Sequence, residues 1–371
     1  MADFNSDFHL PSQGHYLLSH SVGRPLKSLA DHLQTHFYQP WQQGNKEPWE
    51  MWLAGIEQFT VQLATLFNSE ARLFCPQANL SSGLTKFLQS LPQQNKPLRL
   101  LMSEVDFPSM GFAARHARED IELEFIPAKM DLSDIESWQA HLQTDIDYVF
   151  VSHVYSNTGE QAPLHAISTI ARQKGIKVIA DVAQSAGIIE LDLQKTPVDV
   201  LLGSSVKWLC GGPGAAYLWV NEPLLSICKP KDVGWFSHAN PFEFNIHHFA
   251  YHTSALRFWG GTPSVHAYVC AAHSIGYFNQ VGVKQVRAHN WQLLSKLHRA
   301  LAQYIVSPLE QEQASGTAIL SFGDADERVY QALQAHSIAL DKRAKGFRVS
   351  PHLYNCEEDI DRLISVIKQA L

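Results

Sequence analysis

Cysteine is scarce in this sequence, which has five in 371 residues: Cys75, Cys210, Cys228, Cys270 and Cys356. They are odd in number, far apart and never in a Cys-x-x-Cys pair. We therefore expect reduced, buried thiols and neither a disulfide framework nor a cysteine-based zinc site. The sequence also lacks an apolar run near the ~20 residues that a membrane-spanning helix needs, and its first seven residues do not resemble a secretory signal. These absences favour a cytoplasmic protein with no membrane partner.

Positive charge is also limited. The chain has 29 basic and 36 acidic residues, for a formal net charge of −7, which disfavours non-specific binding to nucleic acid. The hydrophobic fraction of 45% and the aromatic fraction of 11% are typical of a folded enzyme, and the length suggests two or three domains. No repeat or low-complexity tract interrupts the sequence.

Two apolar segments each lead to an ionisable residue. Residues 176–181 read as a buried strand that ends at Asp181, and residues 198–203 as a second strand that leads to Lys207. Open α/β sheets bind ligands at the carboxyl ends of their strands, so the carboxylate and the amine are expected in one site. Taken singly, the aspartate could be a turn or helix cap and the lysine a solvated loop residue. The glycine-rich residues 211–214 follow the lysine instead of preceding it, which excludes a P-loop.

The two segments together carry a more specific pattern. Asp-x-Ala-Gln at residues 181–184, Ser-x-x-Lys-Trp-Leu at residues 204–209 and the following Gly/Pro loop resemble the signature of fold-type I, class V enzymes that use pyridoxal 5′-phosphate (PLP). This group includes kynureninases, cysteine desulfurases and class V aminotransferases. The resemblance implies that Lys207 is the catalytic Schiff-base lysine. It also implies that Asp181 is the partner of the pyridine nitrogen and that Gln184 hydrogen-bonds the cofactor.

The resemblance also implies a fold. We expect a large PLP-binding α/β domain with a mostly parallel, seven-stranded sheet over residues 41–265. A small α+β domain is expected over residues 266–371, with the N-terminal segment 1–40 packed against it. Residues 147–181 are expected to form a strand-helix-strand crossover of the large sheet. Residues 317–322, 338–340 and 346–350 are expected to form one small sheet.

Further cofactor contacts follow from shorter matches to the family. Kynureninases bind the PLP phosphate with an Asn-Leu-Thr segment, which corresponds here to Leu80 and Ser81, where we expect the serines to cap a helix. Phe107, in a Phe-Pro-Ser segment, is expected to stack on the pyridine ring. Trp235 resembles a phosphate-contacting tryptophan, and Thr262, in Gly-Thr-Pro, a threonine that reaches the cofactor of the neighbouring subunit. Each of these residues also has an ordinary packing or capping explanation.

Near the C-terminus, residues 348–361 resemble the Arg-x-Ser segment and final helix of class V enzymes. A buried arginine suits a substrate α-carboxylate, so Arg348 is expected to bind the amino-acid substrate. An inter-domain salt bridge is the alternative role for this side chain. The Thr262 match further implies a homodimer with its active site at the subunit interface.

The resemblance specifies the cofactor more closely than the reaction. Residues 341–347, before the arginine, contain no cysteine, which disfavours cysteine desulfuration. Kynureninases carry a tyrosine before the lysine and an aspartate after Phe-Pro-Ser, where this chain has Val206 and Met110. We expect kynureninase-like cleavage of the β side chain, with class V transamination as the alternative; a desulfurase, a selenocysteine lyase-like enzyme and a non-catalytic PLP-binding protein are less favoured.

Three neighbouring histidines are possible metal ligands. His247, His248 and His252 lie close together in sequence, but no acidic residue accompanies them in a His-Glu-x-x-His pattern. We therefore expect no metal site.

Overall fold

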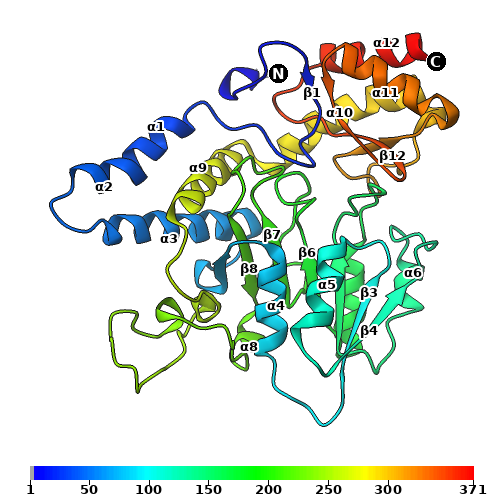
Figure 1. The fold of residues 1–371 in the computed structure, drawn as a ribbon. Helices are drawn as coiled ribbons and strands as arrows, with labels where there is room; N and C mark the ends of the chain where they lie inside the picture. The colour runs from blue at the N-terminus through cyan, green and yellow to red at the C-terminus, as the bar shows by residue number, and fades with distance from the viewer. Residues whose placement is uncertain (1–3) are drawn as a thin grey trace.

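A seven-stranded sheet forms the centre of the molecule in a computed structural model that describes residues 4–371 (Figure 1). Residues 1–3 of the expected N-terminal segment lie outside the described residues. The strand order is β2-β8-β7-β6-β5-β3-β4, and β8 is antiparallel to both of its neighbours while the other four pairs are parallel. This arrangement confirms the predicted, mostly parallel α/β sheet. The strands are β2 (Phe74–Gln77), β3 (Leu98–Ser103), β4 (Ile121–Ile126), β5 (Tyr148–Ser152), β6 (Lys177–Asp181), β7 (Val200–Ser204) and β8 (Ala216–Val220).

Helices cover the sheet on both faces, which explains why its central strands are continuous apolar runs. Every residue of β5 and of β8 is buried, as expected of strands enclosed by helices. The α3 and α9 helices pack along each other. The helices around this sheet are α3 (Trp49–Phe67), α4 (Leu80–Ser90), α5 (Pro108–Ala117), α6 (Ile135–Gln139), α7 (Leu164–Gln173), α8 (Glu222–Leu225) and α9 (Val265–Val281).

A second apolar core lies in the C-terminal part of the chain. It is built from α10, α11, α12 and the strands β9 and β12, and Leu17 from the N-terminal segment joins it. The α9 helix contributes to the first core instead. The division of the chain at residue 265 stays a prediction. The elements of this part are α10 (Val283–Leu301), β9 (Ala318–Leu320), α11 (Asp326–Ala335), β10 (Ile338–Ala339), β11 (Asp341–Arg343), β12 (Gly346–Val349) and α12 (Glu357–Ala370).

The small sheet differs from the expected one in two respects, because β11 joins it and β10 does not. Its order is β11-β12-β9, so residues 317–322 and 346–350 do contribute strands to one sheet. The β10 strand instead pairs in parallel with β1 (His15–Tyr16), beside the C-terminal helices in Figure 1. Periodicity in the sequence indicated a strand at β10 but carried no information about its distant partner.

The N-terminal segment connects the two cores. Its backbone forms a β-bridge to the C-terminal part between Leu18 and Ser350. It also contacts the loop that carries Lys207, because the Gly23 amide donates to the Val206 carbonyl at 2.9 Å. The segment then enters three short helical stretches: α1 (Leu29–Leu33), the π-helical η2 (Gln34–Tyr38) and α2 (Gln39–Gln43).

The remaining helical elements are short. No helix among residues 4–371 has both the length and the apolar character required to cross a membrane. The short 3-10 turns are η1 (Asn5–Asp7), η3 (Ala71–Leu73), η4 (Trp235–Ser237), η5 (Ala255–Phe258), η6 (Ala302–Tyr304) and η7 (Gly323–Ala325).

Candidate active site

Six of the residues singled out from the sequence line one cavity of about 200 Å³. The cavity lies where β5 and β6 end and where α4 and α5 begin, at the carboxyl ends of the parallel strands. This is the place where open α/β sheets bind ligands. The six residues are Leu80, Ser81, Phe107, Asp181, Gln184 and Lys207.

Asp181 is the last residue of β6 and is buried. One carboxylate oxygen accepts a hydrogen bond from the Ala183 amide at 2.8 Å. Burial raises the pKa of Asp181, and the Ala183 amide and the positive charge of Lys207 oppose that rise. The carboxylate is therefore a buried group whose ionised form depends on a nearby positive partner.

Lys207 lies in the loop after β7. Its backbone carbonyl accepts from the Cys210 amide at 3.0 Å, and Cys210 adopts a positive φ of 51°, so the loop turns tightly just after the lysine. Burial lowers the pKa of the amine to about 8; Asp181 partly offsets this effect, and Arg348 adds to it. The lysine thus offers a substantial fraction of neutral, nucleophilic amine near neutral pH.

The start of α4 faces the same cavity, but its cap differs from the expected one. The N-cap is Asn79, whose side chain accepts from the Ser82 amide at 2.8 Å; the serines do not cap the helix. Leu80 and Ser81 follow as the first two helical residues, where backbone amides have no partner within the helix. These amides and the positive end of the helix dipole form a site suited to an anion such as a phosphate.

Gln184 and Phe107 complete the group that the sequence indicated. The Gln184 side chain is buried and donates to the His20 carbonyl at 3.1 Å, which ties the cavity to the N-terminal segment. Phe107 precedes α5, lines the cavity and leaves 46% of its surface exposed, so its ring is accessible to a ligand.

Two further groups were missed by the sequence analysis. Tyr155 lines the cavity with only 1% of its surface exposed, and its hydroxyl has no hydrogen-bond partner in the described part of the chain. A buried hydroxyl without a partner is costly, so a ligand that accepts or donates a hydrogen bond there is favoured. The other group is Asp106, which accepts from the Ser103 amide at 2.8 Å and the Ser152 hydroxyl at 2.7 Å.

Asp106 has a strongly shifted acidity. Burial raises its pKa to about 7, against the opposing hydrogen bonds from Ser152 and Ser103, and the negative charge of Asp181 adds to the rise. The charge of Asp181 therefore affects the ionisation of Asp106. The sequence signal for Asp106 was its place just before Phe107, three residues after β3 ends.

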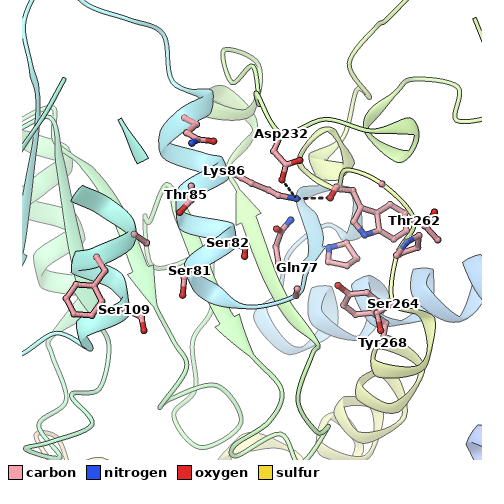
Figure 2. A pocket seen from close by; sticks show the side chains of 18 residues that line it. Gln77, Ser81, Ser82, Thr85, Lys86, Ser109, Asp232, Thr262, Ser264 and Tyr268 are labelled. Atoms are coloured by element: carbon pink, nitrogen blue, oxygen red, sulfur yellow. Dashed lines mark hydrogen bonds and ion pairs between the residues drawn. The ribbon is translucent and has the colours of Figure 1, made fainter. Parts of the chain in front are cut away.

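Trp235 and Thr262 lie outside this cavity. Thr262 lines a neighbouring cavity of about 610 Å³, which Figure 2 shows between α4 and the segment before α9. Lys86 spans that cavity and makes an ion pair of 3.3 Å with Asp232. Ser81 lines both cavities, so the start of α4 separates the two. Trp235 packs edge-on against Trp49, with 5.8 Å between the ring centroids.

Arg348 is buried and already holds a carboxylate of this chain. Its Nε donates to Asp341 Oδ1 at 2.8 Å, and its Nη2 donates to Asp341 Oδ2. A third donor, Nη1, reaches the Ser156 carbonyl at 3.2 Å, so the arginine also contacts the loop after β5. The arginine is therefore engaged by its own hairpin in this structure.

Comparison with known proteins identifies the family of this chain. The sequence matches the family described as Aminotransferase class-V over residues 78–363, more than half of the chain. The chain belongs to the aminotransferase class-V family. As the resemblance implied, this class V protein is an enzyme and its cofactor is PLP.

Relatives of this class V enzyme include an aminotransferase and kynureninases. An uncharacterized aminotransferase, YcbU of Bacillus subtilis, is 27% identical over 82% of this chain and 81% of its own length. A kynureninase of Shouchella clausii is 26% identical over 99% of this chain and 91% of its own length. A kynureninase of Deinococcus radiodurans is also 26% identical, over 100% of this chain and 93% of its own.

Solved structures share the fold of this class V enzyme. A cysteine desulfurase from Thermococcus onnurineus superposes with a TM-score of 0.89 at 18% identity, covering 99% of this chain and 97% of that one. The cystine C-S lyase C-DES, in complex with cysteine persulfide, gives a TM-score of 0.86 at 22% identity, covering 96% of this chain and 97% of that one. At these identities the likeness confirms the fold-type I architecture and not the reaction.

Proposed function

We propose that this class V enzyme cleaves the β side chain of an amino acid, as a kynureninase-like hydrolase or lyase. The observation that carries the proposal is the similarity to kynureninases along 99–100% of the chain. The exposed ring of Phe107 at the cavity supports it, because it lies in the Phe-Pro-Ser segment that this chain shares with kynureninases.

The residues of the cavity fit PLP. We assign the phosphate to the free amides of Leu80 and Ser81, the pyridine nitrogen to Asp181, and the covalent attachment to Lys207. Gln184 is assigned to the ring oxygen, Phe107 to the ring face, and the unpartnered Tyr155 hydroxyl to a polar atom of the cofactor or substrate. When bound, PLP supplies an electron-accepting ring that stabilises negative charge developing at the substrate Cα.

Side chains of the protein then accept the Cα proton and bind the substrate. Lys207, with its pKa lowered to about 8, accepts the proton from the substrate Cα through its Nζ atom. Asp181 supplies a buried negative charge that favours a protonated partner beside it. Arg348 binds the α-carboxylate, which requires that carboxylate to replace Asp341 on the guanidinium.

Transamination is the second candidate. Met110 lines the cavity and is buried, and it brings no carboxylate to the position where kynureninases carry one. Val206 likewise brings no hydroxyl next to the lysine. These two departures, together with the similarity to the YcbU aminotransferase, favour a reaction in which the β side chain is left intact.

Desulfuration through an enzyme cysteine has less support. The hairpin of β11 and β12, residues 341–349, contains no cysteine. Cys356, the N-cap of α12, lies beyond Arg348, and the other four cysteines are buried.

A homodimer and a cytoplasmic location stay predictions. The dimer is supported by the position of Thr262, which lines a cavity next to the PLP site instead of the site itself. We assign this threonine to the cofactor phosphate of the partner subunit. Trp235 does not line the PLP cavity of its own chain. We therefore assign it, like Thr262, to the cofactor phosphate of the partner subunit.

The deciding experiment is an absorption titration of the purified holoenzyme with kynurenine, alanine, cystine and cysteine, with products identified by mass spectrometry. Wild type and Lys207→Ala are compared. β-Side-chain cleavage releases alanine from kynurenine, whereas transamination releases a 2-oxo acid from the same substrate. A 2-oxo acid as the sole product overturns the hydrolase proposal in favour of transamination. No product from any substrate, with the cofactor bound, overturns both.

A further inference from the structure

A second cluster of chemically active side chains lies away from the Lys207 cavity. Residues 238–251 leave η4, loop outwards and return so that His238 and Tyr251 form an antiparallel bridge. This segment belongs to the yellow-green loop at the lower left of Figure 1. His238, Glu243 and His248 converge in it, and none of the three lines the PLP cavity.

His238 is the fixed member of this cluster. The residue is 7% exposed, and its Nε2 atom is buried with no hydrogen-bond partner among the described residues. Its Nδ1 lies 2.8 Å from the Asn240 carbonyl oxygen and 2.9 Å from the Asn240 amide nitrogen, so either tautomer is held by the backbone. When Nδ1–H donates to the carbonyl, the Nε2 lone pair is free, which is the usual arrangement of a metal-binding histidine.

The Glu243 carboxylate lies beside both histidine rings. His248 Nδ1–H donates to Glu243 Oε1 at 2.6 Å, and His238 Nε2 is 4.0 Å from Glu243 Oε2. All three ligand atoms lie within 4.8 Å of one another. A tetrahedral zinc ion with bonds of about 2.0–2.2 Å separates its ligands by about 3.3–3.6 Å. Small side-chain rotations would therefore close the cluster around an ion.

We propose that His238, Glu243 and His248 bind one divalent transition-metal ion, with zinc preferred. Two imidazoles and one carboxylate are a zinc donor set that leaves a fourth position for water. On binding, the ion replaces the proton that His248 Nδ1 shares with Glu243, and His248 takes the other tautomer. The unpartnered Nε2 of His238 gains its missing interaction.

The ion would hold the projecting loop closed. Between the ligands the loop carries Phe242, Phe244 and Ile246, which are 51%, 83% and 94% exposed. Phe242 packs edge-on against Trp235, with ring centroids 5.8 Å apart. Tyr251, at the base of the loop, is anchored by its hydroxyl, which donates to the Pro230 carbonyl at 2.9 Å. A metal between residues 238 and 248 therefore fixes the part of the loop that contacts Trp235.

Another histidine cluster provides the control. His32 packs against both His36 and His273, with ring centroids 4.3 Å apart in each pair. Among residues 4–371, however, only His238, Glu243 and His248 bring three possible metal-ligand atoms within 4.8 Å of one another. His247, adjacent to His248 and not part of the group, is a second matched control.

The test is zinc binding by the tag-free holoenzyme after treatment with a chelator. Zinc is titrated by calorimetry, and Co²⁺ is bound in parallel because its visible spectrum reports tetrahedral coordination. We expect one zinc per chain and a tetrahedral cobalt spectrum. Outer-shell substitutions at zinc sites cost about 10–100-fold in affinity, so Glu243→Gln and His248→Ala are expected to weaken binding at least tenfold. His247→Ala and His273→Ala are expected to leave the affinity unchanged.

Glu243 and His248 are partly exposed, so their variants are expected to fold, which is checked by an unchanged PLP spectrum. Limited proteolysis gives an independent readout: zinc is expected to slow cleavage within residues 239–247 in the wild type but not in Glu243→Gln. The proposal is overturned if no zinc binds. It is also overturned if zinc binds Glu243→Gln and His248→Ala with wild-type affinity, or if His273→Ala abolishes binding.

Discussion

The Asp341 carboxylate sits directly on the Arg348 guanidinium. The two residues are cross-strand partners in the β11–β12 hairpin, and Arg348 Nε donates to Asp341 Oδ1 at 2.8 Å. His20 Nε2–H donates to the same oxygen at 2.9 Å. Burial alone would raise the pKa of Asp341, but the hydrogen bonds from His20 and Arg348 outweigh it and hold the pKa well below its usual range. The ionised Asp341 carboxylate therefore binds the Arg348 guanidinium that we assign to the substrate carboxylate.

Asp341→Asn is expected to lower KM for the amino-acid substrate. The substrate carboxylate no longer competes with an internal anion, and a hydrogen bond to a charged group contributes about 1.5–3 kcal/mol. KM is thus expected to fall by about tenfold, measured by steady-state kinetics. Asp324→Asn, which removes an exposed carboxylate from the same part of the chain, is the matched control. A KM that rises in Asp341→Asn would show that Asp341 positions Arg348 for the substrate.

The rate of PLP attachment to the apoenzyme is expected to depend on the Lys207 amine. Because burial lowers its pKa to about 8, the neutral fraction increases about tenfold per pH unit below pH 8 and then levels off. The attachment rate, followed by absorbance after mixing, is expected to rise between pH 6 and 8 and to reach a plateau above it. Lys207→Ala is expected to show no covalent attachment. A rate that still climbs at pH 10 would contradict a buried amine.

Tyr155→Phe is expected to separate cofactor binding from stability. The hydroxyl has no partner in the described protein, so its loss is expected to leave the Tm of the apoenzyme unchanged or slightly higher. The increase in Tm that PLP produces is expected to shrink, because ligand stabilisation depends on affinity. Tyr217→Phe removes another buried, unpartnered hydroxyl, one that does not line the cavity. Equal PLP-induced shifts in both variants would refute the role of Tyr155.

The stability of the apoenzyme is expected to depend on the ionisation of Asp106. Its pKa is about 7 in the folded state, raised by burial, against ~3.9 in an unfolded chain. Between these values the native state binds more protons, so Asp106 makes the protein less stable as pH rises from about 4 to 7. Asp106→Asn carries no such charge, and its Tm relative to wild type is expected to increase by several degrees between pH 5 and 8. A constant difference across that range would contradict the shifted pKa.

Gly23→Ala is expected to displace the loop that carries Lys207, although the two residues are far apart in sequence. An added Cβ would lie 2.1 Å from the Lys207 carbonyl oxygen and 2.5 Å from Cys210 Sγ, so the loop must move. Such overpacking costs about 1–3 kcal/mol, and the unfolding free energy and the PLP attachment rate are both expected to fall. Gly111→Ala, in α5, meets nothing within 4 Å and is expected to be neutral or slightly stabilising. Normal PLP attachment in Gly23→Ala would contradict this coupling.

The sequence was sufficient for three central strands of the main sheet. The strands β5, β6 and β7 are continuous apolar runs, because both faces are covered, and such runs are visible without a structure. Asp181 and Lys207 follow from them, since side chains at the ends of adjacent parallel strands meet at one edge. The roles assigned to these residues stay predictions until they are tested.

The features that escaped the sequence depend on contacts between distant or unpatterned residues. The pairing of Asp341 with Arg348 follows from the register of a short hairpin, which no periodicity indicates. His238, Glu243 and His248 are spaced by five residues and lie in a loop, so they match no helical metal motif. Tyr155 matches no motif in the sequence, and only its burial without a hydrogen-bond partner singles it out.

The route of the N-terminal segment has a consequence for the order of folding. Residues 15–23 lie between the Lys207 loop and residues 338–355, and they are bonded to both. During synthesis these early residues must wait until more than three hundred others have been added before their partners exist. The large sheet could assemble earlier, but Gln184 and Val206 would lack their ordered hydrogen-bond partners, His20 and Gly23. The nascent chain is therefore expected to acquire PLP late, so that an incomplete chain carries no active enzyme.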